Sequence, residues 1–238
     1  STIRFWDLRC FPDMRDSSER GRYSCPNPDL VAVNGPLARS TLLGAEFPPD
    51  RIIECEALRY QHLGVVTRWK PRLREPDQPM RVLMVSDYLQ AITETMISMA
   101  EEALPDLPSG TQIEIKAHPH SVFDAVAMER LQIKVREEPI SQLVQDYDMA
   151  IVSSGSSAVV DLYVLGLPVI IFQFDDNLDF SPLKGFADLP TVGTSRELVQ
   201  ALMNTEVPVG QPHDVDDIFF LDTSLNRWNS LLSSSPHG

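Results

Sequence analysis

The sequence predicts an α/β fold in which helices flank a parallel β-sheet. From residue 81 onward, apolar runs of strand length alternate with helix-length segments. Strands that alternate with helices of about 10–15 residues form right-handed βαβ units and parallel sheets. Polar clusters also interrupt two apolar stretches, over residues 113–120 and 151–161. Each cluster falls where a strand should end, and that edge of an open α/β sheet is where ligands bind.

The elements of this alternation follow from apolar spacing and from turn residues. Strands are expected over residues 82–86, 112–117, 132–136, 149–153 and 168–173. Helices are expected over residues 90–104, 122–131, 140–146, 156–165 and 195–203. An amphipathic helix over 222–232, carrying Leu225, Trp228 and Leu231, closes the chain.

The first 66 residues hold one small β-α-β step. Residues 1–28 show no sustained period, and we expect an irregular arm there. An apolar run over 29–34 ends at Asn-Gly-Pro, a helix follows with Pro36 in its first turn, and a second short strand covers 51–56. Residues 67–80 contain three prolines and four basic side chains, a composition typical of a linker.

Composition and charge narrow the classes of function. The chain has 238 residues, of which 43% are hydrophobic, so it can build a substantial core. Its formal net charge is −14, whereas a broad nucleic-acid-binding surface needs clustered lysine and arginine. We therefore expect no nucleic-acid partner. No apolar run approaches the roughly 20 residues that span a bilayer, so we expect no transmembrane segment.

The cysteines and the first residue bear on the compartment and on the extent of the protein. The three cysteines, Cys10, Cys25 and Cys55, lack metal-ligand spacing, and their odd number favours a reducing compartment. We therefore expect a cytoplasmic protein. The chain begins at Ser1 with neither an initiator methionine nor a signal peptide, so we expect a piece of a longer polypeptide.

A serine cluster follows the strand expected over 149–153. Gly155 permits a tight turn, and Ser156 and Ser157 fall at the first positions of the next helix. Main-chain N–H groups at a helix N-terminus are unpaired and the helix dipole is positive there, which favours an anion. Serine is also a preferred helix cap. The cluster therefore predicts either a phosphate site or a helix cap.

A His-Pro-His sequence ends the strand expected over 112–117. Pro119 fixes its own backbone and pushes His118 into an extended conformation. The imidazole is thereby presented at the strand end, where it can donate to a phosphate or to a leaving oxygen. The alternative is a histidine that only stabilises the turn. We favour a ligand role for His118 and not for His120.

Further polar residues lie on the same expected edge. Asp161 follows the serines and is either a partner for a ribose hydroxyl or an exposed helix acid. Ser86, followed by Asp87, is either a nucleotide contact or part of an ordinary turn. The acidic loop over 175–179 lacks the glycine and distal glutamate of a calcium loop, so we expect no metal. Walker, zinc-protease and Gly-x-Ser-x-Gly motifs do not occur.

Together these motifs resemble the nucleotide-binding C-terminal half of GT-B glycosyltransferases. The resemblance rests on His-Pro after one strand, Ser-Ser at a helix start, and Leu-Gly-Leu-Pro-Val-Ile-Ile-Phe over 165–172. It is strongest to bacterial sialyltransferases and related Kdo and polysaccharide polymerase enzymes, which use CMP-activated sugars. It covers residues 80–205 well and residues 29–66 loosely.

The resemblance implies roles for individual residues. The residues that match the two phosphate-holding motifs are His118 and Pro119 in the first, and Ser156 and Ser157 in the second. His118 would then stabilise the leaving phosphate. Glu138 and Pro139 fall where these enzymes meet the cytosine through main-chain contacts.

The resemblance also implies a domain organisation. Residues 81–238 would form a Rossmann-like nucleotide-sugar-binding domain with a C-terminal helix, and residues 67–80 a linker. Residues 1–66 would be an arm and the last strand and helix of an otherwise missing N-terminal domain. The related enzymes take their catalytic Asp or Glu from that domain, so we expect the catalytic base outside this chain.

We expect part of an inverting glycosyltransferase that binds a CMP-sugar for bacterial surface polysaccharide synthesis. The nucleotide sugar would be its substrate, a carbohydrate would be the acceptor, and no cofactor would be needed. Peripheral membrane association of the full-length protein is compatible with this role. Two alternatives stay open. One is a CDP-glycerol-type phosphotransferase or UDP-sugar epimerase-like enzyme, and the other is a non-catalytic interaction domain on the same scaffold.

Overall fold

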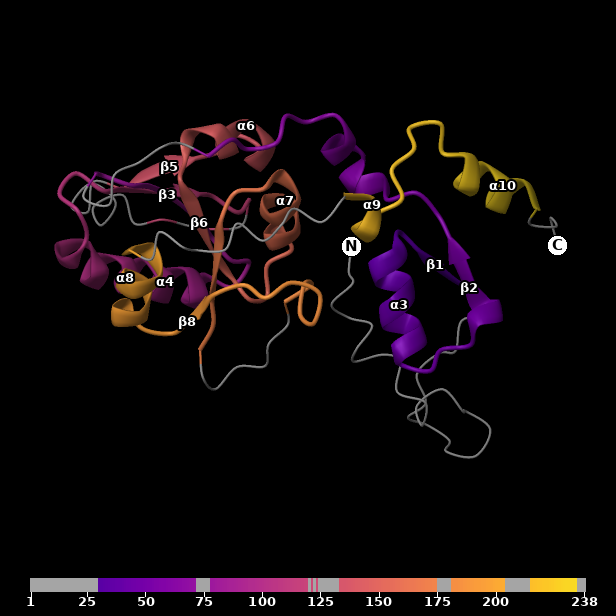
Figure 1. Cartoon of the computed structure of the whole chain (residues 1–238), viewed down its shortest axis with the longest axis horizontal. Helices are drawn as coiled ribbons and strands as arrows, with labels where there is room; N and C mark the ends of the chain where they lie inside the picture. Colours follow the sequence, from indigo (N-terminus) through magenta and orange to yellow (C-terminus); the bar gives the residue numbers. More distant parts are fainter. Residues whose placement is uncertain are drawn as a thin grey trace. The chain divides into compact units, whose positions relative to one another are not determined.

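The computed structural model describes residues 30–71, 78–119, 121, 123, 133–174, 181–203 and 215–234. The chain divides into two compact units, and most of their helices and strands are labelled in Figure 1. The sheet unit comprises Thr67–Pro212, and the small unit comprises Ser1–Val66 together with His213–Gly238.

The described part of the sheet unit is built on six parallel strands in the order β5-β4-β3-β6-β7-β8. They are β3 (Arg81–Val85), β4 (Gln112–Lys116), β5 (Lys134–Arg136), β6 (Met149–Ser153), β7 (Val169–Phe172) and β8 (Thr191–Val192). Every residue of β6 and β7 is buried, as expected for central parallel strands covered on both faces. The sheet and its flanking helices confirm the predicted fold class.

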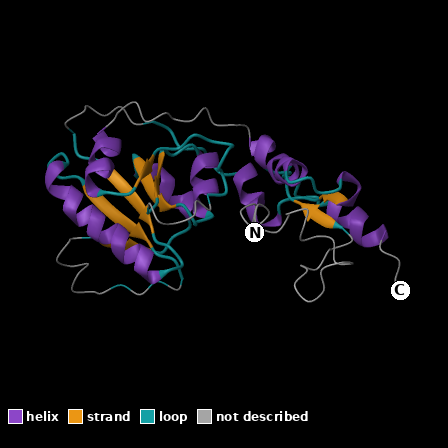
Figure 2. Ribbon diagram, turned by 90° about the horizontal axis from the view of Figure 1, so that it is seen from below, coloured by secondary structure: helices purple, strands orange, loops and turns teal. Residues whose placement is uncertain are grey.

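Helices lie on both sides of this sheet (Figure 2). They are α4 (Gln90–Ala103), α6 (Ile140–Leu143), α7 (Ala158–Leu165) and α8 (Ser195–Met203), with 3-10 turns η5 (Leu104–Asp106) and η6 (Val144–Asp146). Helices α4 and α8 pack together and bury Met96 and Leu198 in one cluster with Met84 and Ile151 of the sheet. Helix α7 contacts β6 and β7, whose alternate side chains, such as Val152, are buried as well.

The small unit contains the β-α-β step that the sequence predicts. Among its described residues, β1 (Val31–Val33) pairs in parallel with β2 (Ile52–Glu54), and α3 (Pro36–Gly44) and the turn η3 (Pro49–Arg51) lie between them. The 3-10 helix η4 (Leu58–Gly64) follows, and α9 (Val215–Ile218) and α10 (Asn226–Ser234) come from the end of the chain. Tyr60 of η4 stacks on Phe219, with ring centroids 4.1 Å apart.

The C-terminal segment belongs to a different unit from the one expected. Residues 213–238 group with the small unit and not with the expected domain over 81–238. The cause is the buried carboxylate of Glu56, whose two oxygens accept the main-chain N–H groups of Arg227 at 2.8 Å and Trp228 at 3.1 Å. Both N–H groups lie in the first turn of α10, and the Trp228 indole also donates to the Glu56 carbonyl at 2.9 Å.

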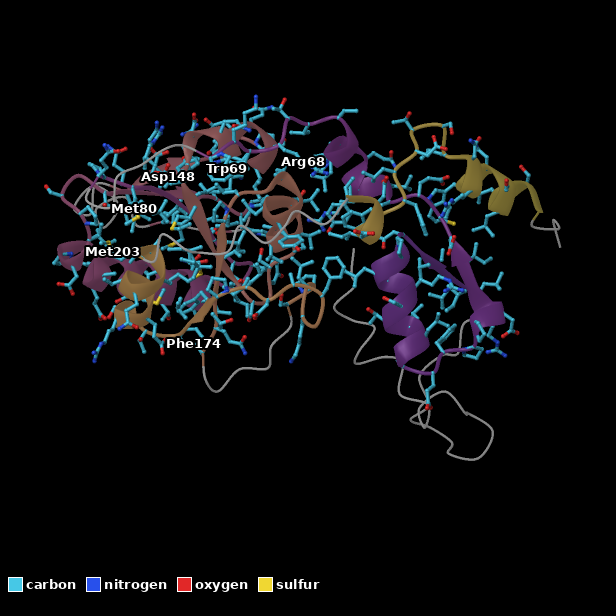
Figure 3. The ribbon with its side chains drawn as sticks, in the orientation of Figure 1. Arg68, Trp69, Met80, Asp148, Phe174 and Met203 are labelled. Atoms are coloured by element: carbon cyan, nitrogen blue, oxygen red, sulfur yellow. The ribbon has the colours of Figure 1, made fainter. Side chains whose placement is uncertain are left out.

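The expected linker over 67–80 groups with the sheet unit. Trp69 anchors its beginning there (Figure 3), because its indole donates to the Tyr147 carbonyl at 2.9 Å and its main-chain N–H donates to the Leu165 carbonyl at 2.7 Å. Residues 72–77 lie outside the described residues, as do most of those in the helix expected over 122–131.

Replacing Glu56 by glutamine should lower the free energy of unfolding of the small unit by about 1–2 kcal/mol at pH 7. Burial tends to raise the pKa of Glu56, but the N–H groups that it accepts hold this pKa below its ordinary value of 4.5. A depressed carboxyl pKa contributes stability above the ordinary value, and this contribution is lost as the pH falls through the folded-state pKa. The difference between the two proteins should therefore shrink in acid. Urea unfolding at pH 7 and pH 4, with pulse-labelled hydrogen exchange of the α10 peptides, measures it.

The matched control is Glu54→Gln. The Glu54 side chain is 40% exposed, and its ion pairs with Arg39 and Arg227 are also exposed. Exposed pairs contribute little, so we expect a loss below about 0.5 kcal/mol. Equal losses in the two variants would contradict a capping role for Glu56.

Candidate functional site

The two motifs singled out by the sequence both lie at the carboxyl edge of the parallel sheet. The sheet extends from β3 to β4 and β5 on one side, and the chain then crosses to β6, β7 and β8 on the other. Connections after β3 and β6 therefore leave in opposite directions, and open α/β sheets bind ligands in the crevice at such a crossover. His118 follows β4, and the serine cluster follows β6.

Ser86 holds the turn that carries His118. The Ser86 hydroxyl accepts the His118 main-chain N–H at 2.6 Å and donates to the Lys116 carbonyl at 3.1 Å. The Ser121 N–H closes the turn on the His118 carbonyl at 2.9 Å, and Pro119 at the second position suits such a turn. Ser86 is 2% exposed, whereas His118 is only half-buried. His118 is therefore the more accessible of the two.

Asp87 joins the end of β3 to the end of β6. Its carboxylate accepts a hydrogen bond from the Ser153 hydroxyl, and another from the Leu89 main-chain N–H at 2.8 Å. Its own main-chain N–H donates to the Thr93 hydroxyl at 2.9 Å. Asp87, Ser153 and Thr93 are all buried. In the sequence, the local sign of this contact is that Asp87 stands beside Ser86 at the end of a strand. The same position also fits an ordinary turn.

The serine cluster forms the turn between β6 and α7. The Ser156 main-chain N–H donates to the Ser153 carbonyl at 3.0 Å, and the Ser156 hydroxyl accepts the Ala158 N–H at 3.3 Å. This contact with the first residue of α7 agrees with the capping role, one of the two that the sequence left open, although Ser157, directly before the helix, makes no side-chain capping bond. Gly155, Ser156 and Ser157 are half-buried. The first turn of a helix also has N–H groups without intrahelical partners, which favours an anion.

A continuous path of contacts joins the two motifs. It runs from His118 to Ser86, through the peptide bond to Asp87, and from the Asp87 carboxylate to Ser153. The residues predicted to contact a nucleotide that lie on this path or directly beside it are Ser86, His118, Pro119, Ser156 and Ser157.

Glu138 and Pro139 lie after β5 and have other partners. The Arg136 guanidinium donates to the Glu138 carboxylate at 2.7 and 3.0 Å, and it lowers the pKa of Glu138 to about 2. Pro139 immediately precedes α6. The Glu138 side chain therefore binds Arg136. The cytosine contact through the main chain of Glu138 and Pro139 stays a prediction.

Other positions near this edge have different outcomes. Asp161 is half-buried in the first turn of α7, and its contact with a ribose stays a prediction. His120 and the whole acidic loop over 175–179 lie outside the described residues. Tyr88, which the sequence did not single out, is 68% exposed and meets the His118 ring edge-on, with centroids 5.7 Å apart.

Neither a metal-binding cluster nor a membrane-spanning helix occurs among the described residues. Within them, no group of three or more His, Cys, Asp or Glu side chains is arranged to hold a metal ion. The described helices include none with the length and apolar character required to cross a membrane.

Comparison with known proteins gives the class of fold. The chain matches no protein-family profile and no curated protein. Its architecture matches the Rossmann-like domains of the GT-B fold, and the similar solved structures include UDP-GlcNAc 2-epimerases and a glycosyltransferase.

Three of these structures illustrate the likeness. UDP-GlcNAc 2-epimerase from Methanocaldococcus jannaschii, in complex with UDP-GlcNAc and UDP, has a TM-score of 0.51 at 12% identity, over 93% of this chain and 67% of that one. Another UDP-N-acetylglucosamine 2-epimerase has a TM-score of 0.50 at 13% identity, over 79% and 54%. MurG from Acinetobacter baumannii has a TM-score of 0.49 at 15% identity, over 87% and 73%. At these identities the likeness concerns the fold alone, and the chain spans only part of each structure.

Proposed function

We propose that the chain binds the nucleotide of an activated sugar at the carboxyl ends of β3, β4 and β6. The observation that supports this most is the contact path from the His118 main chain through Ser86 and Asp87 to Ser153, because it links the turn that carries the imidazole to the strand end that leads into the serine turn. Hydroxyl, imidazole and main-chain N–H groups all donate to phosphate oxygens. Such donors bind an anion without a cluster of cations, which is compatible with a net charge of −14.

In its finer form, the proposal is an inverting transfer from a CMP-sugar in the synthesis of a bacterial surface polysaccharide. An acceptor hydroxyl, deprotonated by a carboxylate outside this chain, attacks the anomeric carbon while the bond to the CMP phosphate oxygen breaks. His118 donates to that phosphate and stabilises its growing negative charge. The main chain of Glu138 and Pro139 meets the cytosine, and Asp161 meets the ribose.

A cytoplasmic location is part of the same proposal. Cys55 is a free and buried thiol, which is compatible with a reducing compartment. Nothing in this chemistry calls for a cofactor, because the nucleotide sugar itself carries the leaving group.

A uridine nucleotide is the second candidate ligand. Two of the similar structures are UDP-GlcNAc 2-epimerases, and one of them holds UDP-GlcNAc and UDP. The fold they share with this chain accommodates a uridine nucleotide in that protein, so an epimerase-like reaction belongs among the outcomes of the test.

Calorimetric titration with CMP, UMP and their nucleosides tests the proposal. Wild-type protein should bind at least one monophosphate more tightly than its nucleoside. His118→Ala should weaken monophosphate binding by about ten- to a hundredfold, the range for a lost hydrogen bond to a charged group. Its nucleoside affinity should not change, because the lost contact is to the phosphate.

His62→Ala is the matched control, since His62 lies in η4 of the small unit, and its affinities should equal those of the wild type. Preference for UMP over CMP would favour the uridine candidate. Equal monophosphate binding by wild type and His118→Ala would refute the role of His118. Failure of the wild type to bind any of these nucleotides would refute the proposal and favour a non-catalytic interaction domain.

A further inference from the structure

We propose that Ser86 and Asp87 are positioning residues that together hold the His118 turn and the serine turn, the two phosphate-binding motifs, at a fixed separation. We call this pair of residues the clip. The inference rests on the proposed function. Strand β3 lies between β4 and β6 in the sheet. The two consecutive residues after β3 bond to opposite neighbours, Ser86 to the turn after β4 and Asp87 to the last residue of β6. One dipeptide therefore sets the separation of His118 from the serine turn.

The Ser86 hydroxyl uses all of its hydrogen-bonding capacity within the protein. Its hydroxyl hydrogen goes to the Lys116 carbonyl at 3.1 Å, and its oxygen accepts from the His118 N–H at 2.6 Å and from the Ser121 hydroxyl at 3.1 Å. A hydroxyl has one hydrogen and two lone pairs, so these three bonds satisfy it. Ser86 is also buried, which favours support of the His118 turn over direct contact with a ligand.

Asp87 is held by hydrogen bonds with three different residues. Leu89 donates its main-chain N–H to one carboxylate oxygen at 2.8 Å, and Ser153 donates its hydroxyl to the other. The Thr93 hydroxyl, buried in α4, accepts the Asp87 main-chain N–H at 2.9 Å. A Cβ added to Gly155 would be in ordinary van der Waals contact with Asp87 Oδ2, 3.9 Å away. The carboxylate is thus bonded to the last residue of β6, which leads into the serine turn.

The charge of Asp87 separates a positioning role from a binding role. A carboxylate repels a nearby phosphate, so Asp87 would weaken an anion site if it acted only through its charge. Its partners in the described structure are a hydroxyl and an N–H group. We infer that it acts through these bonds, which orient the turn whose N–H groups receive the phosphate.

Two measurements on four variants test the clip. The variants are Asp87→Ala, Asp87→Asn, Ser86→Ala and Ser153→Ala, with the exposed Asp188→Asn and Ser98→Ala as matched controls. Hydrogen exchange of the main-chain N–H groups of residues 154–157 and 118 is measured without ligand, with β7 as the internal reference. The ratio of the cytidine Kd to the CMP Kd is measured by calorimetry, together with the uridine and UMP pair.

For Asp87→Ala and Ser153→Ala we expect hydrogen exchange over residues 154–157 to rise about tenfold relative to β7. The ratio of nucleoside Kd to monophosphate Kd should fall about tenfold, the effect of losing one such bond. Ser86→Ala should raise exchange at the His118 N–H and lower the Kd ratio by similar factors, and Asp87→Asn, which keeps an acceptor oxygen, should change both quantities less than Asp87→Ala. A general loss of stability would raise exchange in β7 equally and leave the ratio unchanged, which would overturn the proposal.

Two other outcomes are also decisive. Tighter CMP binding by both Asp87 variants, with unchanged exchange, would show that Asp87 is only a neighbouring charge and would overturn the clip. If the wild type binds no nucleotide, the proposed function fails by itself. The exchange of residues 154–157 and 118 then decides alone whether the clip holds these turns, because that measurement needs no ligand.

Discussion

Replacing Gly35 by alanine should destabilise the small unit by more than about 4 kcal/mol, a loss that point mutations reach only exceptionally. A Cβ built on Gly35 would overlap the carbonyl oxygen of Ile218 and would lie 2.7 Å from the Cα of Phe219. Both contacts are with main chain, which cannot turn aside as a flexible side chain can. Ile218 and Phe219 are completely buried, and the Phe220 N–H donates to the Asn34 carbonyl at 3.0 Å.

The cause of this expected loss is close approach and not backbone conformation. The φ of Gly35 is 174°, an extended value that any residue adopts. Alanine therefore keeps the local conformation but separates the turn before α3 from α9. Urea unfolding, with pulse-labelled hydrogen exchange of peptides over residues 31–47 and 215–221, should show early exposure of both segments while the β6 peptide is unchanged.

Gly44→Ala is the matched control in the same unit. A Cβ at Gly44 would meet no atom within 4 Å, and the residue closes α3, where alanine is the better helix former. Stability should stay equal or rise by up to about 1 kcal/mol. If Gly35→Ala unfolded at the same urea concentration as Gly44→Ala, the close packing of α9 on this turn would be wrong.

Local pattern was sufficient for the strands and turns that carry the candidate site. Continuous apolar runs predicted β6 and β7, and Gly155 with its serines predicted the turn between β6 and α7, which begins at Ala158. His118 before Pro119 predicted a histidine at a strand end. These features depend on residues within a few positions of one another, and period and turn chemistry describe such neighbourhoods well.

Contacts between distant positions were beyond the local pattern. Ser86 and His118 are 32 positions apart, and Asp87 and Ser153 are 66 apart, so their meeting depends on the order of strands in the sheet. The close packing around Gly35 likewise depends on residues that are far apart in the sequence. Asn-Gly-Pro predicts a turn, but the approach of α9 from the end of the chain is a tertiary contact. The clip and the divided small unit could therefore be recognised only from the folded chain.

Disrupting a buried network of charged side chains in the sheet unit should destabilise that unit about as much as Gly35→Ala destabilises the small unit. Glu114 of β4 is 8% exposed. Its carboxylate accepts from the Arg136 guanidinium at 2.9 Å and from the Tyr147 hydroxyl at 2.5 Å. Arg136→Met would leave this carboxylate buried without its cation, and removal of one partner from a buried ion pair typically costs about 3–5 kcal/mol. We expect that loss in the free energy of unfolding of the sheet unit at pH 7, measured by urea unfolding.

The pH dependence identifies Glu114 as the cause. Burial tends to raise its pKa, but the bonds from Tyr147 and Arg136 outweigh burial and hold the pKa below the ordinary value of 4.5. In the wild type this contributes stability above pH 4.5 that is lost as the pH falls through the lower folded-state pKa. Without Arg136, the pKa of Glu114 should be higher than in the wild type, because only the Tyr147 bond then opposes burial, so acid should weaken the penalty of the unpaired charge as Glu114 is protonated. The gap between wild type and variant should therefore be widest near pH 7 and should narrow below pH 5.

Two further variants separate the buried pair from the exposed one on the same guanidinium. Glu114→Gln combined with Arg136→Met removes both charges, so the double variant should be more stable than Arg136→Met alone, because no unpaired anion stays buried. Glu138→Gln removes the partner that is 45% exposed and should change stability far less than Arg136→Met. A double variant no more stable than Arg136→Met would mean that the loss comes from packing of the arginine side chain and not from the charge of Glu114.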